Sequence, residues 1–593
     1  MMVFPLRVLL VTLVAVFSSS WSLNVALIPS SGCYSHDIMM KQVGEEFGSS
    51  DNVTWIQAYL YEFGFGEISL PEKWIRISLW GVDDDGKRLM EQAGNLLWEQ
   101  NVPTDFDRPW DLRGSLHFIK ILERHQNYCE KMLLDQRFVQ YMKTVQTDVV
   151  VLDHFLQECM GGLSHLLNAS VVQFSNWPIA DGYITSLNVP ANPSATPKTG
   201  TPFSGLGMTF LERVSNVLFH SIIVVARVVQ VLILDGLFAR HGYPEVRILQ
   251  TEADRVIHAG RSEFLFDVVR PISNRVKHFG GASIDPKDFV IALPKTDAPL
   301  QVRGDVKIYL DTGISIANST VRNCTLCEKD CEETRMESHI QYRSDIYTGL
   351  SSHEVKQRFT AVQSKFPGID WETINQNSFI LVSFGSVAKV ENMPLPLLRL
   401  LLATFQRSHH EILWQTNSDM PPILQKNNIS LPQNTRIVSW APIKELLAHP
   451  NLQYIVCHGG INTVNELLLF GVPVVGVPLQ GDQGSNLRRL GDLGAAEIVS
   501  TVRLKEGDLE LAMKRMEANL GSYWQRASRL SSMVRHYRTL HQNDQRFWLN
   551  WAARNGRKMK ERNIMRMQYI GDEENGFWLA IGLVLATVFV LFY

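Results

Sequence analysis

Short apolar runs rich in β-branched residues alternate with helix-length stretches along both halves of the chain, and this alternation constrains the fold most. In the first half the predicted strands are 24–28, 53–58, 148–152 and 170–174, and a helix is predicted from Ser35, as its N-cap, to about Phe47. In the second half the predicted strands are 378–384, 411–414, 436–439, 454–457, 474–477 and 497–499. Near-continuous apolar strands separated by helices are typical of parallel sheets covered on both faces. The sequence therefore predicts an α/β fold in two halves, each with a parallel sheet.

Size and charge narrow the classes of function. A chain of 593 residues has room for several domains at roughly 150 residues each. Lys and Arg number 57 against 60 Asp and Glu, whereas a generic nucleic-acid-binding protein carries a basic excess. Seven cysteines are too few for a disulfide scaffold, and the odd count leaves at least one thiol without a partner in the chain. We expect a packed globular protein with no nucleic-acid partner.

The two ends of the chain predict its compartment. Arg7, an apolar run over 8–17 and the small residues Ser20 and Ser22 are typical of a secretory signal peptide cut after Ser22. That apolar run is too short to span a bilayer. Residues 577–593 contain no charged side chain, and at ~1.5 Å per residue they reach ~26 Å, enough for one spanning helix.

The charges beside this predicted span oppose the orientation that the signal peptide implies. Basic residues precede the span and none follows it, which by the positive-inside rule favours a cytosolic body; they are Arg554, Arg557, Lys558, Lys560, Arg562 and Arg566. Because a cleaved signal peptide commits the chain to translocation, we expect a lumenal body. Five glycosylation sequons agree with a lumen, at Asn52, Asn168, Asn318, Asn323 and Asn428.

Two further segments have alternative interpretations. The apolar run 217–234 carries His220, Arg227 and Gln230, and a central Arg costs ~2.5–3.5 kcal/mol on insertion, so a buried or membrane-surface helix is favoured over a second span. The cysteines of the irregular stretch 290–375 could bind zinc, but no fourth ligand lies at a suitable spacing. A disulfide plus one spare thiol is favoured for Cys324, Cys327 and Cys331.

An anion site is predicted where the strand 454–457 runs into His458 and two glycines and a helix opens near Asn462. Free backbone amides and the helix dipole at such a junction attract a phosphate. Gly471 closes the helix where a left-handed cap is wanted. His458, Asn462 and Glu466 are spaced four apart and would share one helix face. The alternative is that Thr463 and Glu466 form a capping box with no ligand role.

A second set of polar residues lies in the first half. His36 follows the first predicted strand, and Asp153 ends the strand 148–152, so both are expected at the carboxyl edge of one sheet, where α/β proteins bind ligands. Because a helix N-terminus disfavours imidazolium, His36 is expected to be neutral and able to accept a proton. Asp153 would orient its ring. Taken alone, either residue is more simply a cap or a loop residue.

A forty-residue stretch resembles the signature of the UDP-glycosyltransferases, which move a sugar from a UDP-sugar to a small lipophilic acceptor. Its matching positions are Trp440, Pro442, Leu446, Leu447, His449, Pro450, His458, Gly459, Gly460, Asn462, Glu466, Gly471, Val472, Pro473, Pro478, Asp482, Gln483 and Asn486. Family-like segments also occur at 209–213, 264–271 and 382–386. The resemblance implies two Rossmann-like domains facing across a cleft, the GT-B type, followed by the C-terminal transmembrane helix.

The resemblance also implies roles by position. Trp440 would stack on uracil, and Glu466 would accept hydrogen bonds from the ribose. The diphosphate would lie against His458, Ser386 and the amides at Gly460, Asn462 and Thr463. The sugar hydroxyls would be bound by Asp482 and Gln483. His36 would be the catalytic base and Asp153 its partner, which reverses the preference for a structural role.

Two features depart from the family. Three residues after the Trp the family has Gln and this chain has Ile443, so an amide that would bond the nucleoside is missing. The basic tail after the anchor, with its retrieval signal, is absent from this sequence. The rival to an enzyme is therefore a lumenal binding or interaction protein on a degenerate transferase scaffold. A nicotinamide oxidoreductase is a weaker rival, because no Gly-x-Gly-x-x-Gly follows either first strand.

Together these features predict a membrane-anchored, lumenal hexosyltransferase of the endoplasmic reticulum. His36 would take the proton of the acceptor hydroxyl, which attacks the anomeric carbon in line and inverts it. UDP-glucose is the favoured donor and UDP-glucuronate the alternative. No metal or separate cofactor is expected, since the UDP-sugar is a co-substrate, and a homo-oligomer is left open. The expected divisions are 1–22 (signal peptide), 23–289 (acceptor domain), 290–375 (insert), 376–545 (UDP-sugar domain), 546–576 (basic juxtamembrane segment) and 577–593 (transmembrane helix).

Overall fold

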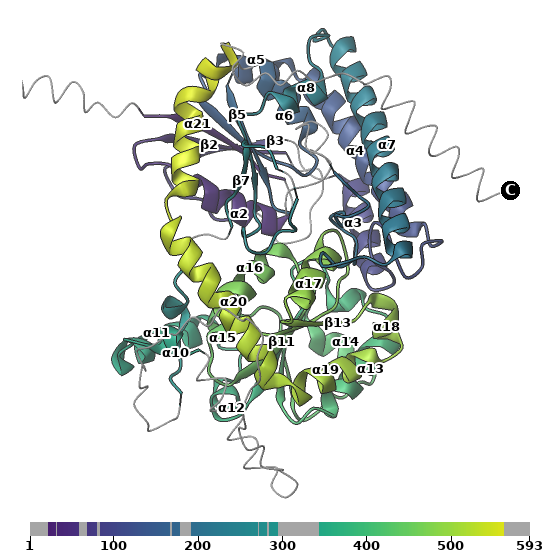
Figure 1. The fold of residues 1–593 in the computed structure, drawn as a ribbon, viewed down its shortest axis with the longest axis vertical. Helices are drawn as coiled ribbons and strands as arrows, with labels where there is room; N and C mark the ends of the chain where they lie inside the picture. The colour runs from purple at the N-terminus through teal and green to yellow at the C-terminus, as the bar shows by residue number, and fades with distance from the viewer. Residues whose placement is uncertain are drawn as a thin grey trace, which may run out of the picture.

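The computed structural model describes residues 22–30, 33–58, 68–79, 83–166, 169–177, 191–270, 272–280, 284–294 and 343–561. Outside these residues lie nearly all of the predicted signal peptide, the group Cys324, Cys327 and Cys331, the sequons at Asn168, Asn318 and Asn323, and the predicted span 577–593. The described chain forms two α/β halves, one above the other in Figure 1, each built round a parallel sheet.

The N-terminal sheet has the strand order β3-β2-β1-β4-β5-β6-β7, and every neighbouring pair is parallel. Its strands are β1 (Asn24–Ile28), β2 (Asn52–Ala58), β3 (Ile75–Leu79), β4 (Val149–Asp153), β5 (Ser170–Ser175), β6 (Ile257–Gly260) and β7 (Val276–His278). The four strands predicted in this half are confirmed. The other three carry weak signals, since β3 is a half-exposed edge strand and β7 has three residues.

Helices cover both faces of this sheet. One face is covered by α2 (Tyr34–Gly44) and α21 (Asp544–Glu561), and the other by α4 (Arg113–Leu134), α5 (Gln136–Thr144), α6 (Glu158–Leu166) and α7 (Phe210–Arg240). The other helices of this half among the described residues are α3 (Asp84–Leu97), α8 (Ile248–Ala253) and the 3-10 helix η2 (Pro286–Phe289). The prediction that Ser35 caps the first helix is wrong. The N-cap is Cys33, two residues earlier, where the backbone is still extended, and the helix begins at Tyr34.

Helix α7 lies on the surface of the N-terminal half, beside α4 (Figure 1). In the described chain it is the one helix long and apolar enough to cross a membrane, and 17% of its most apolar window is buried. Its Arg227 is held by Glu158 of α6 and Glu252 of α8, so the helix is fastened to this domain by buried carboxylates. The expectation of a buried helix is wrong, and a membrane-surface position stays a prediction.

The C-terminal sheet has the order β10-β9-β8-β11-β12-β13, again all parallel. Its strands are β8 (Phe379–Ser383), β9 (Glu411–Gln415), β10 (Thr435–Val438), β11 (Leu452–Cys457), β12 (Val474–Gly476) and β13 (Ala496–Ile498), each within two residues of its predicted position. Helices surround it: α10 (Ser344–Tyr347), α11 (Ser352–Lys365), α12 (Trp371–Gln376), η3 (Val390–Asn392), α13 (Leu395–Gln406), α14 (Met420–Lys426), α15 (Ile443–Leu447), α16 (Ile461–Phe470), α17 (Gln483–Asp492), α18 (Thr501–Lys505), α19 (Asp508–Ala518) and α20 (Leu520–Leu540).

The end of the described chain returns to the N-terminal half. After α20, helix α21 runs back along the N-terminal sheet, as the yellow end of the ribbon shows (Figure 1). Leu549, Ala552 and Ala553 join the core on that face, and Arg557 Nη2 donates to the Thr147 carbonyl at 3.1 Å. Residues 546–561, expected to begin a juxtamembrane segment, are therefore part of the packing between the two halves.

In each sheet the strand order reverses at one point, and the two points face the same cavity between the halves. The order reverses between β1 and β4 in one sheet and between β8 and β11 in the other. Ligands of open α/β sheets bind beyond the carboxyl ends of the strands at this point. Backbone hydrogen bonds from Val102 to Leu479 (3.1 Å) and from Gly481 to Val102 (2.7 Å) join the halves at the rim. The fold thus places two ligand-binding edges opposite each other.

Candidate active site

A cavity of about 760 Å³ lies between the two reversal points and is lined by both halves. It brings together almost every residue singled out from the sequence. The predicted site residues that line it are His36, Ser386, Trp440, Ile443, His458, Gly460, Asn462, Thr463, Glu466, Asp482 and Gln483. Asp153 lies directly behind His36 and is fully buried.

His36 and Asp153 form a buried hydrogen-bonded pair. Nδ1 of His36 lies 2.9 Å from Oδ2 of Asp153. The contact follows from the fold, because β1 and β4 are neighbouring parallel strands whose carboxyl ends meet at one edge. With Nδ1 engaged by the carboxylate, Nε2 is the ring nitrogen that remains for a substrate proton.

The pair shifts both pKa values. Burial alone would lower the pKa of His36, but the charge and hydrogen bond of Asp153 outweigh it and raise that pKa above the ordinary 6.5. Burial alone would raise the pKa of Asp153, but the neighbouring His36 and His154 hold it well below its usual range. The expectation that the helix N-terminus keeps His36 neutral is therefore wrong in direction, since the adjacent carboxylate dominates over the weaker helix dipole.

The diphosphate end is built from the loop between β11 and α16. Helix α16 begins at Ile461 with Gly460 as its N-cap, and no side chain caps it. The alternative that Thr463 and Glu466 form a capping box is therefore wrong. The residues of this first turn, 460–463, line the cavity, and a helix N-terminus favours an anion there. The left-handed C-cap at Gly471 is confirmed, with φ of 67°.

His458 is wedged between two glycines at this end. A Cβ on Gly385, whose φ is +77°, would lie 2.5 Å from His458 Nε2, and one on Gly460 would lie 2.7 Å from it. Burial lowers the pKa of His458 to about 4. A neutral imidazole held this closely can donate one N–H to a phosphate oxygen. It adds no positive charge to the site.

Glu466 lies one turn deeper along α16, between two cations. Burial raises the pKa of its carboxyl, and Lys444 and Arg261 oppose that rise. Lys444 Nζ lies 3.9 Å from Glu466 Oε1. A carboxylate held at this depth can accept hydrogen bonds from the two hydroxyls of a ribose.

The nucleoside end is aromatic and apolar. Trp440 lines the cavity and is 40% exposed. The Tyr34 ring of the other half lies edge-on to it, with ring centroids 5.8 Å apart. Ile443 is the first residue of α15 and packs on the core while lining the cavity. The departure at Ile443 therefore lies in the cavity wall.

Asp482 and Gln483 open helix α17 beneath the His36–Asp153 pair. Burial raises the pKa of Asp482 to about 6, and Asn486 Nδ2 donates to its Oδ2 at 2.6 Å. The Gln483 Oε1 accepts from the amides of Leu479 (2.9 Å) and Gln480 (3.0 Å), which fixes the side-chain amide. The two side chains thus present a carboxylate and an NH₂ group in fixed positions.

Arg261 is a residue of the site that the sequence analysis missed. It follows β6 at the same carboxyl edge, is 5% exposed and lines the cavity. Its Nη2 donates to Gln42 at 2.7 Å, while its Nε and Nη1 have no protein partner. Burial lowers its pKa to about 10, so it stays charged near neutral pH. The signal that could have found it is its place after a sheet strand, but β6 itself was not predicted.

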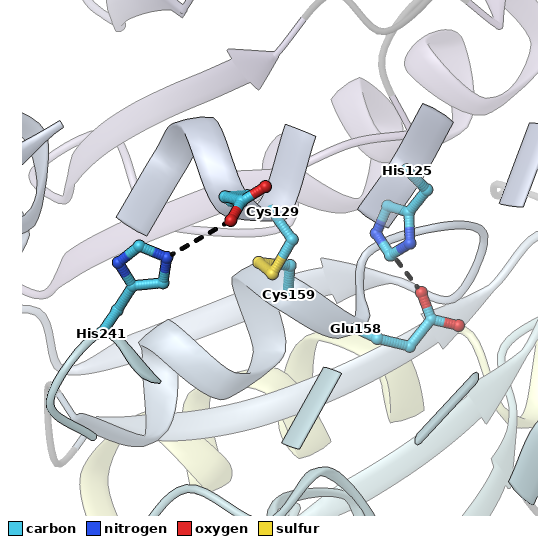
Figure 2. Close-up of a disulfide and its surroundings, with 6 residues drawn as sticks. His125, Cys129, Glu158, Cys159 and His241 are labelled. Carbon is cyan, nitrogen blue, oxygen red and sulfur yellow. Dashed lines mark ion pairs between the residues drawn. A yellow bond between two sulfur atoms is a disulfide. The ribbon is translucent and has the colours of Figure 1, made fainter. Parts of the chain in front are cut away.

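A smaller side chamber of about 220 Å³ adjoins the cavity within the N-terminal half. Its apolar lining includes Phe118, Leu122, Phe155, Trp177, Phe219 and Ile223. Figure 2 shows the disulfide that joins Cys129 of α4 to Cys159 of α6, with His125 and Glu158 nearby. Nε2 of His125 lies 3.6 Å from Oε2 of Glu158. The sequence analysis did not predict this disulfide, because the two cysteines lie 30 positions apart in no recognisable motif.

The sequence matches the family described as "UDP-glucoronosyl and UDP-glucosyl transferase" over residues 83–291 and 363–593. The chain belongs to this UDP-glycosyltransferase family. The match covers Asp153, Arg261 and the whole donor side of the cavity, whereas His36 lies before its first residue. For this UDP-glycosyltransferase, the resemblance found in the signature is thus confirmed at the level of the family.

Curated relatives of this UDP-glycosyltransferase carry several activities. It is 34% identical over 140 residues to an ecdysteroid UDP-glucosyltransferase of Lacanobia oleracea granulosis virus, covering 24% of this chain and 29% of that protein. It is 31% identical over 179 residues to the 2-hydroxyacylsphingosine 1-beta-galactosyltransferase of Rattus norvegicus, covering 30% and 31%. It is 29% identical over 226 residues to UDP-glucuronosyltransferase 2A3 of Mus musculus, covering 37% and 40%. The matched stretch spans about a third of the length of these relatives.

Solved structures of glycosyltransferases are similar over most of the chain. Os79 from O. sativa, in complex with UDP, is 15% identical, with 86% of this chain and 95% of that chain covered and a TM-score of 0.45. LpCGTa, also in complex with UDP, is 14% identical, with 89% and 99% covered and a TM-score of 0.43.

Proposed function

We propose that the chain transfers a hexose from a UDP-sugar to a hydroxyl of a small lipophilic acceptor, with inversion at the anomeric carbon. The observation that carries this proposal is the position of the buried His36–Asp153 pair opposite the N-terminus of α16, across one cavity. A base on one wall and an anion site on the other are the two parts that a single displacement on a UDP-sugar needs.

The chemical step uses one proton and one electron pair. Nε2 of His36 takes the proton of the acceptor hydroxyl while the oxygen forms a bond to the anomeric carbon. The bond from that carbon to the β-phosphate oxygen breaks, and its electron pair leaves on UDP. Asp153 stabilises the imidazolium that forms, as in other His–Asp pairs. Attack from the face opposite the leaving group inverts the configuration.

The leaving UDP gains negative charge, and three groups would stabilise it. They are the free amides at the start of α16, the neutral His458 N–H and the Arg261 guanidinium. Ser386 lies in the same wall, after β8. Trp440 would stack on uracil and Glu466 would bind the ribose. UDP-glycosyltransferases use the UDP-sugar as a co-substrate and need no separate cofactor.

UDP-glucose is the favoured donor, with UDP-glucuronate as the alternative. Near neutral pH the Asp482 carboxylate is mainly ionised and suits a neutral hexose, whose hydroxyls donate to it. The carboxylate of a glucuronate donor would be repelled by the Asp482 carboxylate. The relatives include a glucosyl-, a galactosyl- and a glucuronosyltransferase by name, so similarity alone does not choose the donor.

The acceptor would lie in the side chamber, whose wall is mostly aromatic and aliphatic. A lipophilic body there would reach past Phe155 and Trp177, which line both spaces, and bring its hydroxyl to His36. This is the basis for proposing lipophilic alcohols or phenols as acceptors.

The rival function is binding without turnover, and Ile443 is its best argument. The intact His36–Asp153 pair argues against it, because a buried, charged pair is costly to keep without a use. Turnover of the full-length membrane-bound protein with 1-naphthol and each of UDP-glucose, UDP-galactose and UDP-glucuronate, together with calorimetric titration by UDP, separates the two. We expect UDP to bind and UDP-glucose to give the highest turnover. UDP binding without turnover on any donor would favour the rival, and absence of UDP binding would contradict both.

We further propose a lumenal body in the endoplasmic reticulum, held by a membrane anchor at 577–593. The Cys129–Cys159 disulfide supports an oxidising compartment. Exposed apolar side chains on α7, among them Phe210, Ile222 and Leu232, support contact with the bilayer surface. Asn52 and Asn428, the two described sequons, are exposed and open to glycosylation. Protection of the body from protease in sealed microsomes and a mobility shift on endoglycosidase treatment are the expected results, and digestion without a shift would contradict the orientation.

A further inference from the structure

Asp153 is followed by a second buried histidine that the proposed reaction does not use. His154 is 5% exposed, and its Nδ1 lies 3.3 Å from Oδ1 of Asp153. His36 occupies the other carboxylate oxygen, Oδ2, at 2.9 Å. One carboxylate is therefore flanked by two imidazole rings, one on each oxygen.

The two histidines face different spaces. His36 lines the large cavity, whereas His154 lines the side chamber. Their rings are stacked, with centroids 6.0 Å apart and planes 21° apart. On its other side His154 packs against the Trp177 ring at 5.2 Å. His154 thus stands in the wall between the base and the chamber proposed for the acceptor.

The surroundings decide which histidine carries charge. Burial lowers the pKa of His154, and although Asp153 and Glu158 raise it and His36 lowers it further, the net shift is downward. Asp153 raises the pKa of His36 most, and Asp37 and Asp482 raise it further only where their carboxyls are ionised. Burial raises the pKa of Asp37 to about 8, so this carboxyl is mainly protonated near neutral pH. Protonation of the pair therefore falls on His36, and His154 stays neutral.

We propose that His154 is a positioning residue that draws part of the Asp153 charge away from His36 and so moderates how tightly the base holds its proton. This inference rests on the proposed role of His36. A neutral ring N–H close to Oδ1 stabilises the carboxylate on the side away from His36. The backbone amide of Phe155 also donates to Oδ1, at 3.0 Å, so His154 supplies one of two contacts on that atom.

Removing His154 should therefore strengthen the attraction between Asp153 and protonated His36. In His154→Phe, which keeps a ring of similar size, we expect the acid limb of the kcat/KM profile to move up by roughly half to one pH unit. Below the midpoint this lowers kcat/KM about three- to tenfold, and well above it the rates converge, because the base itself is intact. His154→Asn keeps a side-chain N–H and should leave the midpoint near that of the wild type.

The measurement is the pH profile of kcat/KM for 1-naphthol, taken with the full-length membrane-bound protein at saturating UDP-glucose. The affinity for UDP is the second readout. UDP affinity should stay unchanged in both variants. His258→Phe is the matched control, since it replaces another buried histidine outside the cavity and should not move the acid limb. A profile of His154→Phe that overlays the wild type at every pH would overturn the inference. If His154→Phe does not fold, a midpoint shift in His154→Asn would overturn it instead.

Failure of this inference can be told apart from failure of the proposed function. Full turnover in His36→Ala would show that His36 is not the base, and the proposed function would fail. An inactive His36→Ala combined with an unshifted His154→Phe profile would leave the base in place and remove only the role of His154.

Discussion

Nδ1 of His36 lies 2.9 Å from Oδ2 of Asp153, although 117 positions separate the two residues in the chain. The neighbouring parallel strands β1 and β4 bring them together, and Asp153 is fully buried while His36 lines the cavity.

The rate should depend on pH through His36. Since Asp153 raises the pKa of His36 above 6.5, and the base works in its neutral form, kcat/KM should increase with pH through a midpoint above 6.5. Below that midpoint the slope should be about tenfold per pH unit. In Asp153→Asn the midpoint should fall, because burial then acts without the charge of Asp153, the group that raises the pKa of His36 most. A midpoint that is the same in both proteins would contradict the coupling.

Gly385→Ala should weaken UDP binding roughly tenfold, since an Ala at φ of +77° costs about 1–2 kcal/mol and its Cβ would displace His458. Gly368→Ala is the matched control, because a Cβ there meets nothing within 4 Å. Calorimetric titration with UDP measures both. Equal UDP affinity in the two variants would show that His458 is not held by this glycine.

Ile443→Gln should restore one hydrogen bond to the nucleoside and improve donor affinity by ~0.5–1.5 kcal/mol, up to about tenfold. The gain should appear with free UDP as well, because the contact is to the nucleoside. Ile443→Leu, which adds no amide, is the control and should leave the affinity near the wild-type value. Weaker UDP binding in Ile443→Gln would mean that this wall of the cavity is adapted to an apolar side chain.

The disulfide between Cys129 and Cys159 should stabilise the N-terminal half. It closes a loop of 30 residues, so the double variant Cys129→Ala, Cys159→Ala should lose about 3–4 kcal/mol of unfolding free energy. Cys33→Ala, which lies outside this bridge, should change it much less. Urea unfolding followed by tryptophan fluorescence measures the difference, and equal unfolding midpoints would contradict this role.

The sequence predicted the second half better than the first for a physical reason. Strands such as β8 and β11 are buried at every position and carry one polar residue each, Ser383 and Gln453, so the apolar run is visible without other information. Edge strand β3 has only exposed and half-buried positions, without regular alternation, and β7 is three residues long. Neither produces a pattern that differs from a loop.

The site shows the same division. His36 and Asp153 could be placed at one edge of the sheet because each follows a visible strand, whereas their proposed catalytic role came from the family resemblance. Arg261 could not be predicted, since β6 was not visible. The partner Asp153 was predicted, but the upward shift of the His36 pKa was not, because that prediction rested on the helix dipole and the Asp153 charge has the stronger effect. The packing of α21 on the N-terminal sheet could not be predicted either, because its basic residues resemble those that flank a membrane span.

The central claim is that proton removal and donor binding reside on opposite walls of one cavity. Turnover and UDP affinity of His36→Ala, measured beside Glu466→Ala, test it most directly. His36→Ala should lose ~10²–10⁴-fold in turnover with nearly unchanged UDP affinity, because it removes only the base. Glu466→Ala should instead weaken UDP binding, because it removes charge-assisted bonds to the ribose. Full turnover in His36→Ala would contradict the account, even with the family and the fold unchanged.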